Sequence, residues 1–210
     1  MLLQSIPVVI LMALLALVFL GLLHRVLDRM RLTRLQAMVL LGLMLVGGFM
    51  PDIVLGRGLA FNVGGALIPL GVCIYLLATA DTRLERIRGV LAAVVAAVVL
   101  WGLEVMLPGQ PGIGRFDIDP LYMPPLVAGL TAYLLGRSRR AAFIGGVLGV
   151  FLLDLGFWLW NVAAGLPMGP VVLGGGGVFG AMVVAGVFAV LLAELIGEIR
   201  ERLGGGPAHV

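Results

Sequence analysis

The amino-acid sequence predicts an all-α membrane protein, a polytopic bundle of about seven transmembrane helices with the N-terminus outside and the C-terminus in the cytoplasm. The first observation is composition: the 210 residues are 61% hydrophobic and 12% charged, and their mean hydropathy is +1.17. A soluble domain carries roughly 25% charged residues, so no soluble core accounts for this apolar surplus. The second is the succession of apolar runs, each near the roughly 20 residues that a helix needs to cross a bilayer. The third is a one-sided distribution of Arg.

The apolar runs are set off by Pro, Gly and Arg clusters, and seven of them are long enough to be predicted spans. They cover residues 6–23, 35–50, 63–80, 89–107, 121–135, 141–160 and 171–193. In the first of them the Arg cluster follows the apolar residues, which favours a retained anchor over a signal peptide. The spans together predict a single transmembrane domain over residues 1–203, followed by a disordered tail over residues 204–210.

The Arg residues predict the orientation, because positively charged short loops stay in the cytoplasm. Alternate connections and the C-terminal tail hold 12 of the 14 Arg residues. The other side has only Arg57 and Arg115. We therefore expect the first residue outside and the last residue inside the cell membrane of a bacterium or archaeon.

Several kinds of chemistry are excluded by what the sequence lacks. There is no Lys for Schiff-base chemistry, Cys73 is the only Cys, and Ser and His occur twice each. An intramembrane Ser/His or Cys/His pair and an HExxH zinc site are thus unavailable. The run Gly174 to Gly177 lacks the GK[ST] ending of a phosphate loop, and no strand is predicted before it. We expect no cofactor, no bound metal and no nucleic-acid partner, and we assign no catalytic residue.

Small residues form stripes on three predicted spans and indicate where helices pack closely, since lipid provides little hydrophobic drive between helices. On the last span the stripe comprises Gly177, Ala181, Ala185, Ala189 and Ala193. On the fourth it comprises Ala92, Ala93, Ala96 and Ala97, opposite a Val-rich face. On the sixth it comprises Gly145, Gly149 and Gly156.

Ionisable residues inside spans are the main candidates for function, because a charge in the bilayer is costly. Asp154 lies about two-thirds along the sixth span, and Asn161 continues its stripe toward the outside. Glu104 lies two helical turns after Ala97, on the packed side of the fourth span or at the interface. A protonated Asp154 bonded to neighbouring backbone is the structural alternative to a binding role.

The outer ends of three spans have irregular sequences, which membranes tolerate only where protein or water covers the backbone. The third begins with Asn62, which is suited to cap a helix, followed by Gly64, Gly65 and Pro69. The fifth begins among Pro120, Pro124 and Pro125, and the seventh among the four glycines. We expect these ends to form an outward-facing polar pocket. Its predicted binding residues are Asn62, Gly65, Glu104, Asp154, Asn161, Gly175, Gly176 and Gly177.

From Asn62 to Glu194 the chain resembles a family of prokaryotic polytopic membrane proteins defined as a domain of unknown function. The family pattern has an N-x-GGALIP helix start, a Gly-Ala-Asp-Leu turn and a GGAGTFDGI-like segment. The matching residues are Asn62, Gly64, Gly65, Pro69, Asp154, Gly177 and Phe179. Gly180 stands where the family has a second Asp. The resemblance therefore implies a polytopic membrane fold and no specific activity.

Three functions are compatible with these observations. The first is translocation of a small cation or polar solute, because the predicted outer side is acidic and broken helix ends beside an acid recur in transporter sites. The second is an intramembrane aspartyl-protease-like hydrolase, active or degenerate, in which Glu104, Asp117 or Asp119 replaces the missing Asp. The third is a noncatalytic assembly protein. The expected partners are the lipid bilayer, a second copy or partner membrane helices, and the small cation or polar solute.

Overall fold

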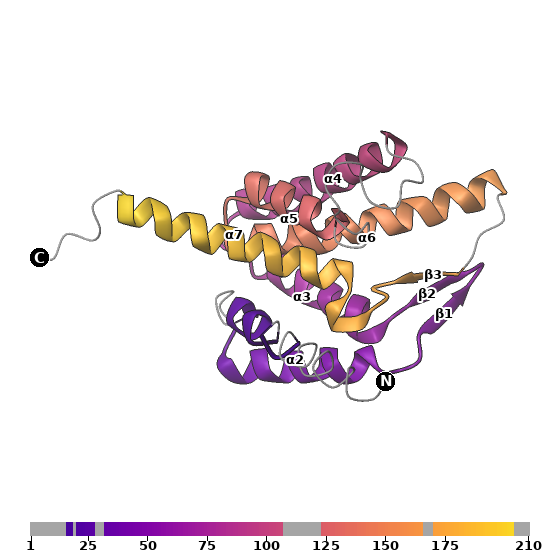
Figure 1. Ribbon diagram of the computed structural model, residues 1–210, viewed down its shortest axis with the longest axis horizontal. Coiled ribbons are helices and arrows are strands. Elements are labelled where there is room, and N and C mark those ends of the chain that lie inside the picture. Colours follow the sequence, from indigo (N-terminus) through magenta and orange to yellow (C-terminus); the bar gives the residue numbers. More distant parts are fainter. Residues whose placement is uncertain (1–15, 19, 28–31, 107–122, 166–169, 204–210) are drawn as a thin grey trace, which may run out of the picture. The chain divides into compact units, whose positions relative to one another are not determined.

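The computed structural model describes residues 16–18, 20–27, 32–106, 123–165 and 170–203 (Figure 1). The chain divides into two compact units, Met1–Gly42 and Leu43–Val210. In the first unit, residues 16–18 and 20–27 are helical, so only the end of the predicted first span lies within the described residues. The predicted tail 204–210 lies outside them.

Helix α2, Arg34–Gly48, begins in the first unit and ends in the second. Its start is a reciprocal cap: the backbone N–H of Gln36 donates to Thr33 Oγ1 at 3.2 Å, and that of Thr33 donates to Gln36 Oε1 at 2.9 Å. This exchange satisfies two N–H groups that a helix leaves unpaired at its N-terminus. The predicted span 35–50 therefore corresponds to a helix within two residues at either end.

After α2, the described part of the second unit contains five helices, and the first four are α3 over Ile68–Ala78, α4 over Arg83–Met106, α5 over Met123–Gly136 and α6 over Arg139–Ala164. Its last helix, α7, spans Ala181–Leu203. A π-helical turn, η1, covers Val63–Leu67 directly before α3, and a 3-10 turn, η2, covers Gly177–Phe179 shortly before α7. The predominantly helical architecture confirms the all-α class.

A small sheet was not predicted. It has three strands in the order β1, β2, β3, which are Ile53–Gly56, Leu59–Phe61 and Val171–Leu173. Strands β1 and β2 form an antiparallel hairpin, whose loop residues Arg57 and Gly58 both have positive φ, 51° and 74°. That conformation matches the right-handed twist of the flanking strands. Strand β3 pairs in parallel with β2, with Leu59 opposite Val171 and Phe61 opposite Leu173.

The sheet corrects two predictions about the last span. Residues 171–173 are a strand and not the start of a helix, and this strand directly precedes the four glycines. Gly174, Gly176 and Gly177 then have φ of 70°, 87° and 59°. Such left-handed backbone interrupts a helix and is accessible to glycine without strain. The helix begins only at Ala181, ten residues after the predicted start at Val171.

Three of the described helices are long and apolar enough to cross a membrane by length and composition: Arg83–Met106, Arg139–Ala164 and the part of α7 from Ala181 to Ile199. The apolar segments Leu35–Gly48, Val63–Ala78 and Met123–Gly136 are shorter. These helices correspond to the predicted spans from the second to the seventh, with the corrected start of the last.

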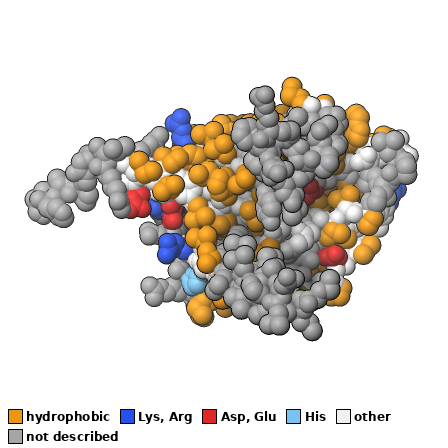
Figure 2. Space-filling view, in the orientation of Figure 1, with side chains coloured by type: hydrophobic (Ala, Val, Ile, Leu, Met, Phe, Trp, Pro, Cys, Tyr) orange, Lys and Arg blue, Asp and Glu red, His pale blue; other side chains and the backbone are white. Residues whose placement is uncertain are grey.

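On α4, mostly small residues face the inside of the second unit and large apolar ones face outward. Helix α4 buries Gly89, Ala92, Ala93, Ala96 and Leu100, whereas Val94, Val98 and Val99 are exposed. Figure 2 shows apolar side chains spread over much of the visible face. Extensive exposed apolar surface marks a surface that contacts something other than water, and small residues at helix contacts are typical of packing in lipid. The Ala stripe predicted for this helix is confirmed, although Ala97 is only half-buried.

Helix α6 is the centre of this packing, because it contacts α4, α5 and α7. A Cβ atom added to Gly145 would lie 2.8 Å from the Cβ of Ala92 and 2.9 Å from that of Ala132. One added to Gly146 would lie 2.7 Å from the carbonyl oxygen of Ala185. These separations leave no room for a larger side chain, so glycine determines how closely α6 approaches its neighbours.

Candidate functional site

Asn62 joins the sheet to α3 through both its backbone and its side chain. Its Oδ1 atom accepts a hydrogen bond from the backbone N–H of Gly65 at 2.8 Å, and its Nδ2 atom donates to Asp52 Oδ1 at 2.9 Å. The backbone N–H of Asn62 donates to the carbonyl of Leu173 at 3.0 Å. Asn62 is buried, with 6% of its surface exposed, and its predicted capping role is confirmed. A buried amide with these partners holds local structure and leaves little capacity for a ligand.

The glycines of η1 and of the loop after β3 meet in direct backbone contact. A Cβ atom on Gly65 would overlap the carbonyl oxygen of Gly174 and would lie 2.7 Å from that of Gly177. Gly177 itself lies against Gly48 at the end of α2, with 3.0 Å between its added Cβ and the Gly48 Cα. The structure thus brings together the starts of the third and seventh spans, as predicted, but it fills the contact with backbone.

The other predicted members of this region lie apart from that contact. Gly175 and Gly176 are exposed in the turn that follows β3. Pro124 and Pro125 lie in the first turn of α5, where a helix tolerates proline because those N–H groups have no helical partner. Pro120 lies outside the described residues.

Asp154 and Glu104 are on neighbouring helices, α6 and α4. These helices run side by side with a constant offset, shown by the contacts of Glu85 with Ser138, Ala92 with Gly145 and Ala96 with Gly149. Continuing this register brings Trp101 to the level of Asp154 and Glu104 to the level of Phe157. In this register Glu104 and Asp154 lie about one helical turn apart along the two helices. Asp154 is half-buried, and Glu104 is exposed near the end of α4.

Within the described ranges, no neighbouring side chain neutralises either carboxylate. Among the residues that the structure describes, no hydrogen bond or ion pair reaches Asp154 or Glu104. In the same part of the chain, no group of three or more His, Cys, Asp or Glu side chains could hold a metal ion. The pair therefore forms a local negative charge beside an apolar helix contact, suited to a proton or a cation.

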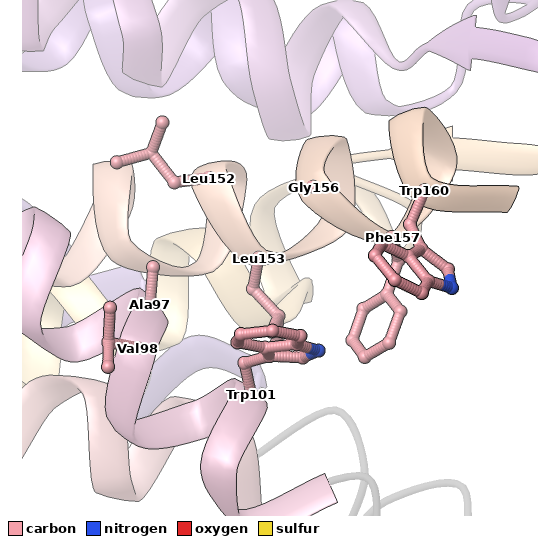
Figure 3. Close-up of a pocket in the computed structure, with 8 residues that line it drawn as sticks. All are labelled: Ala97, Val98, Trp101, Leu152, Leu153, Gly156, Phe157 and Trp160. Carbon is pink, nitrogen blue, oxygen red and sulfur yellow. The ribbon is translucent and has the colours of Figure 1, made fainter. Parts of the chain in front are cut away.

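A pocket of about 270 Å³ lies between α4 and α6 at the level of this pair (Figure 3). Its lining is apolar and rich in aromatic rings. It comprises Ala97, Val98, Trp101, Leu152, Leu153, Gly156, Phe157 and Trp160. In Figure 3 the rings of Phe157 and Trp160 lie on one side of the opening and the indole of Trp101 on the other. Neither Glu104 nor Asp154 lines this pocket, although both lie within about one helical turn of its aromatic residues along α4 and α6. Asn62 and the glycine loop do not line it either.

Asn161 lies two turns after Asp154 on α6, and its Nδ2 donates to the carbonyl of Phe157 within the same helix at 2.8 Å. The next side chain toward the sheet is Trp158, whose indole N–H donates to the carbonyl of Arg57 at 3.1 Å. Phe61, beside Asn62, packs its ring against Phe151, with 6.4 Å between centroids. The sheet thus lies against the same half of α6 that carries Asp154.

The aromatic residues of the pocket are the part of the site that sequence reasoning missed. Trp101 precedes Glu104 by three residues, and Phe157 follows Asp154 by three. Residues three apart are neighbours on a helix surface, so each acid has an aromatic neighbour on its own helix. The three-residue spacing is visible in the sequence and could have indicated the aromatic neighbours of the acids. The packing of α4 against α6 is not visible in the sequence.

Comparison with known proteins places the chain in a family without adding an activity. No curated protein and no solved structure matches it. A family model matches residues 26–192, which include Asn62, Glu104, Asp154 and the glycine loop. The match begins before the region that the sequence motifs indicated and confirms the resemblance. The chain belongs to the family described as "Protein of unknown function (DUF1614)".

Proposed function

We propose that the protein is a multi-pass protein of the bacterial or archaeal cell membrane that translocates a small cation, with Glu104 and Asp154 as the groups that attract it. In this topology the N-terminus is outside, and the cation reaches Glu104 and Asp154 from the outer side of the membrane. A polar solute carrying positive charge is included in this class.

The observation that carries the proposal is the packing of α4 on α6, which holds Glu104 and Asp154 within about one helical turn of each other on two apolar helices. Acids within membrane helices are costly, and they mark ion and proton pathways when they are retained. Like charges so close favour a shared proton or cation, because either relieves their mutual repulsion. The proposed outer side is also acidic, since Arg57 and Arg115 are its only basic residues.

The test is flux through purified full-length protein in proteoliposomes, measured for protons, Na⁺, K⁺ and Mg²⁺ down imposed gradients. Asp154→Asn and Glu104→Gln keep the side-chain volumes and remove the charges, so each should abolish most of the flux. Glu198→Gln makes the same chemical change at an exposed position of α7 and should leave the flux intact. Absence of flux for all four ions would refute translocation of inorganic cations, and unchanged flux in Asp154→Asn would refute the role proposed for the acid pair.

The same pair also favours a second function, an intramembrane hydrolase. Two carboxyl groups that share a proton can activate water for peptide hydrolysis. Glu104 lies within about one helical turn of Asp154 in the packing of α4 on α6, and Gly180 stands where the resembled family pattern has its second Asp. Cleavage of labelled transmembrane peptides by the wild type, lost in both Glu104→Gln and Asp154→Asn, would support the hydrolase. If neither flux nor cleavage is detected, an assembly role remains, in which the small-residue helix surfaces bind partner helices.

A further inference from the structure

The aromatic pocket and the acids of α4 and α6 lie at neighbouring levels of the same two helices. We propose that the α4–α6 pocket binds a small lipophilic ammonium ion, with its apolar part among Trp101, Phe157 and Trp160 and its charged centre beside Glu104 and Asp154. The inference rests on the proposed function and names the class of cation that this site would take.

The shape and lining of the pocket support an organic ligand. Its volume of about 270 Å³ is close to the lower end of the range for small-molecule sites, roughly 300 to 1,000 Å³. Within that lining, only the two indole N–H groups can form hydrogen bonds. A ligand that needs several polar partners would lose its hydration without replacement. A compact, mostly apolar ligand has few hydrated groups, so it would not lose hydration in this way.

The charge of the ligand follows from what surrounds the pocket. Aromatic faces attract cations through their electron-rich surfaces, and ammonium ions held by several rings are the recurring example. The acids add a second attraction, because they lie on the same two helices at the same level as the rings. An anion would meet only repulsion here. A bare inorganic cation would gain little from the apolar wall, whereas a quaternary ammonium ion has no N–H group to leave unpaired.

The chain offers its own reporter for this site. It contains three Trp residues, Trp101, Trp158 and Trp160, and two of them line the pocket. Trp158 instead donates its N–H to Arg57. The variant Trp158→Phe therefore restricts the tryptophan fluorescence to the two pocket indoles, which excitation at a wavelength that Tyr does not absorb isolates from the three Tyr residues.

The experiment is titration of purified full-length Trp158→Phe protein in detergent with benzyltrimethylammonium. Neopentylbenzene is the matched neutral ligand, with the same shape and a carbon in place of the charged nitrogen. We expect saturable fluorescence change with the ammonium ion and at least tenfold weaker binding of the neutral ligand. In the same background, Trp101→Leu, Asp154→Asn and Glu104→Gln should each weaken ammonium binding about tenfold, which corresponds to about 1.4 kcal/mol. Glu198→Gln should bind normally.

Three outcomes would overturn the inference. One is the absence of saturable ammonium binding. Another is equal affinity for the two ligands, which would make the pocket a groove for lipid chains. The third is normal ammonium binding by Asp154→Asn and Glu104→Gln with unchanged melting temperatures.

The binding result is separable from the flux result. Flux of inorganic cations without ammonium binding would reject this inference alone, and ammonium binding without any flux would reject the proposed translocation alone.

Discussion

Gly65 and Gly174 approach so closely that a side chain on Gly65 would overlap the carbonyl oxygen of Gly174. The two residues are far apart in the chain, one in η1 before α3 and the other directly after β3. Their contact is adjacent to the parallel pairing of β2 with β3, where Phe61 is opposite Leu173. The start of α3 and the approach to α7 are thus joined by backbone packing and strand pairing at one point.

The first prediction concerns this contact. Gly65→Ala should lower the melting temperature, because overpacking a filled site typically costs roughly 1 to 3 kcal/mol. Gly71→Ala is the matched control on α3, where an added Cβ has no neighbour within 4 Å and alanine is the better helix former. Thermal unfolding of both variants in detergent would check this. Equal melting temperatures would show that the two segments separate in solution.

The second prediction concerns the cap at Asn62. Asn62→Ala removes the acceptor for the Gly65 N–H and the donor to Asp52, so we expect a loss of stability of about 0.5 to 2 kcal/mol, the usual range for a helix cap. Asn62→Asp keeps the acceptor but sets two carboxylates against each other. Adding Asp52→Asn to that variant supplies a new donor and should raise its melting temperature. No difference between the single and double variants would mean that the side chains of residues 52 and 62 do not interact.

The third prediction concerns the small stripe of α7. Ala185 and Ala189 are fully buried, and a Cβ on Gly129 of α5 would lie 2.9 Å from the carbonyl oxygen of Ala185 and 3.3 Å from the backbone nitrogen of Ala189. Ala185→Leu and Ala189→Leu should therefore each destabilise by roughly 1 to 3 kcal/mol. Val184→Leu, at a half-buried position of the same helix, should cost much less. Equal melting temperatures for the three variants would place this stripe outside the helix contacts.

The fourth prediction concerns topology. Because 12 of the 14 Arg residues lie on one predicted side, short loops on that side should remain in the cytoplasm. A fluorescent-protein fusion after Val210 should be fluorescent, and an alkaline phosphatase fusion after Gly109 should be active. A cytoplasmic result at the second site would also remove the outer access on which the cation proposal depends.

The helices could be predicted from sequence because their signal is local. Apolar runs, Arg clusters and small-residue stripes each lie within about 20 consecutive residues, and helical periodicity assigns them to faces. The predicted span 63–80 agrees closely with the combined η1 and α3, and the stripe over Ala92, Ala93 and Ala96 is buried as expected. The cap at Asn62 was predictable for the same reason, since its bond to Gly65 spans three residues.

The sheet and the pocket could not be predicted because their partners are distant in the chain. Strand β3 has three residues, too few for a periodic pattern, and its pairing of Val171 with Leu59 depends on the helices between them. The proximity of Glu104 to Asp154 follows from the offset at which α4 packs on α6, which is determined where glycines and alanines let the backbones meet. The sequence by itself determined most of the described helical segments, apart from the start of the last one, and which residues are ionisable. Tertiary packing decided which of those residues meet, because close approach between helices depends on the joint shape of both surfaces.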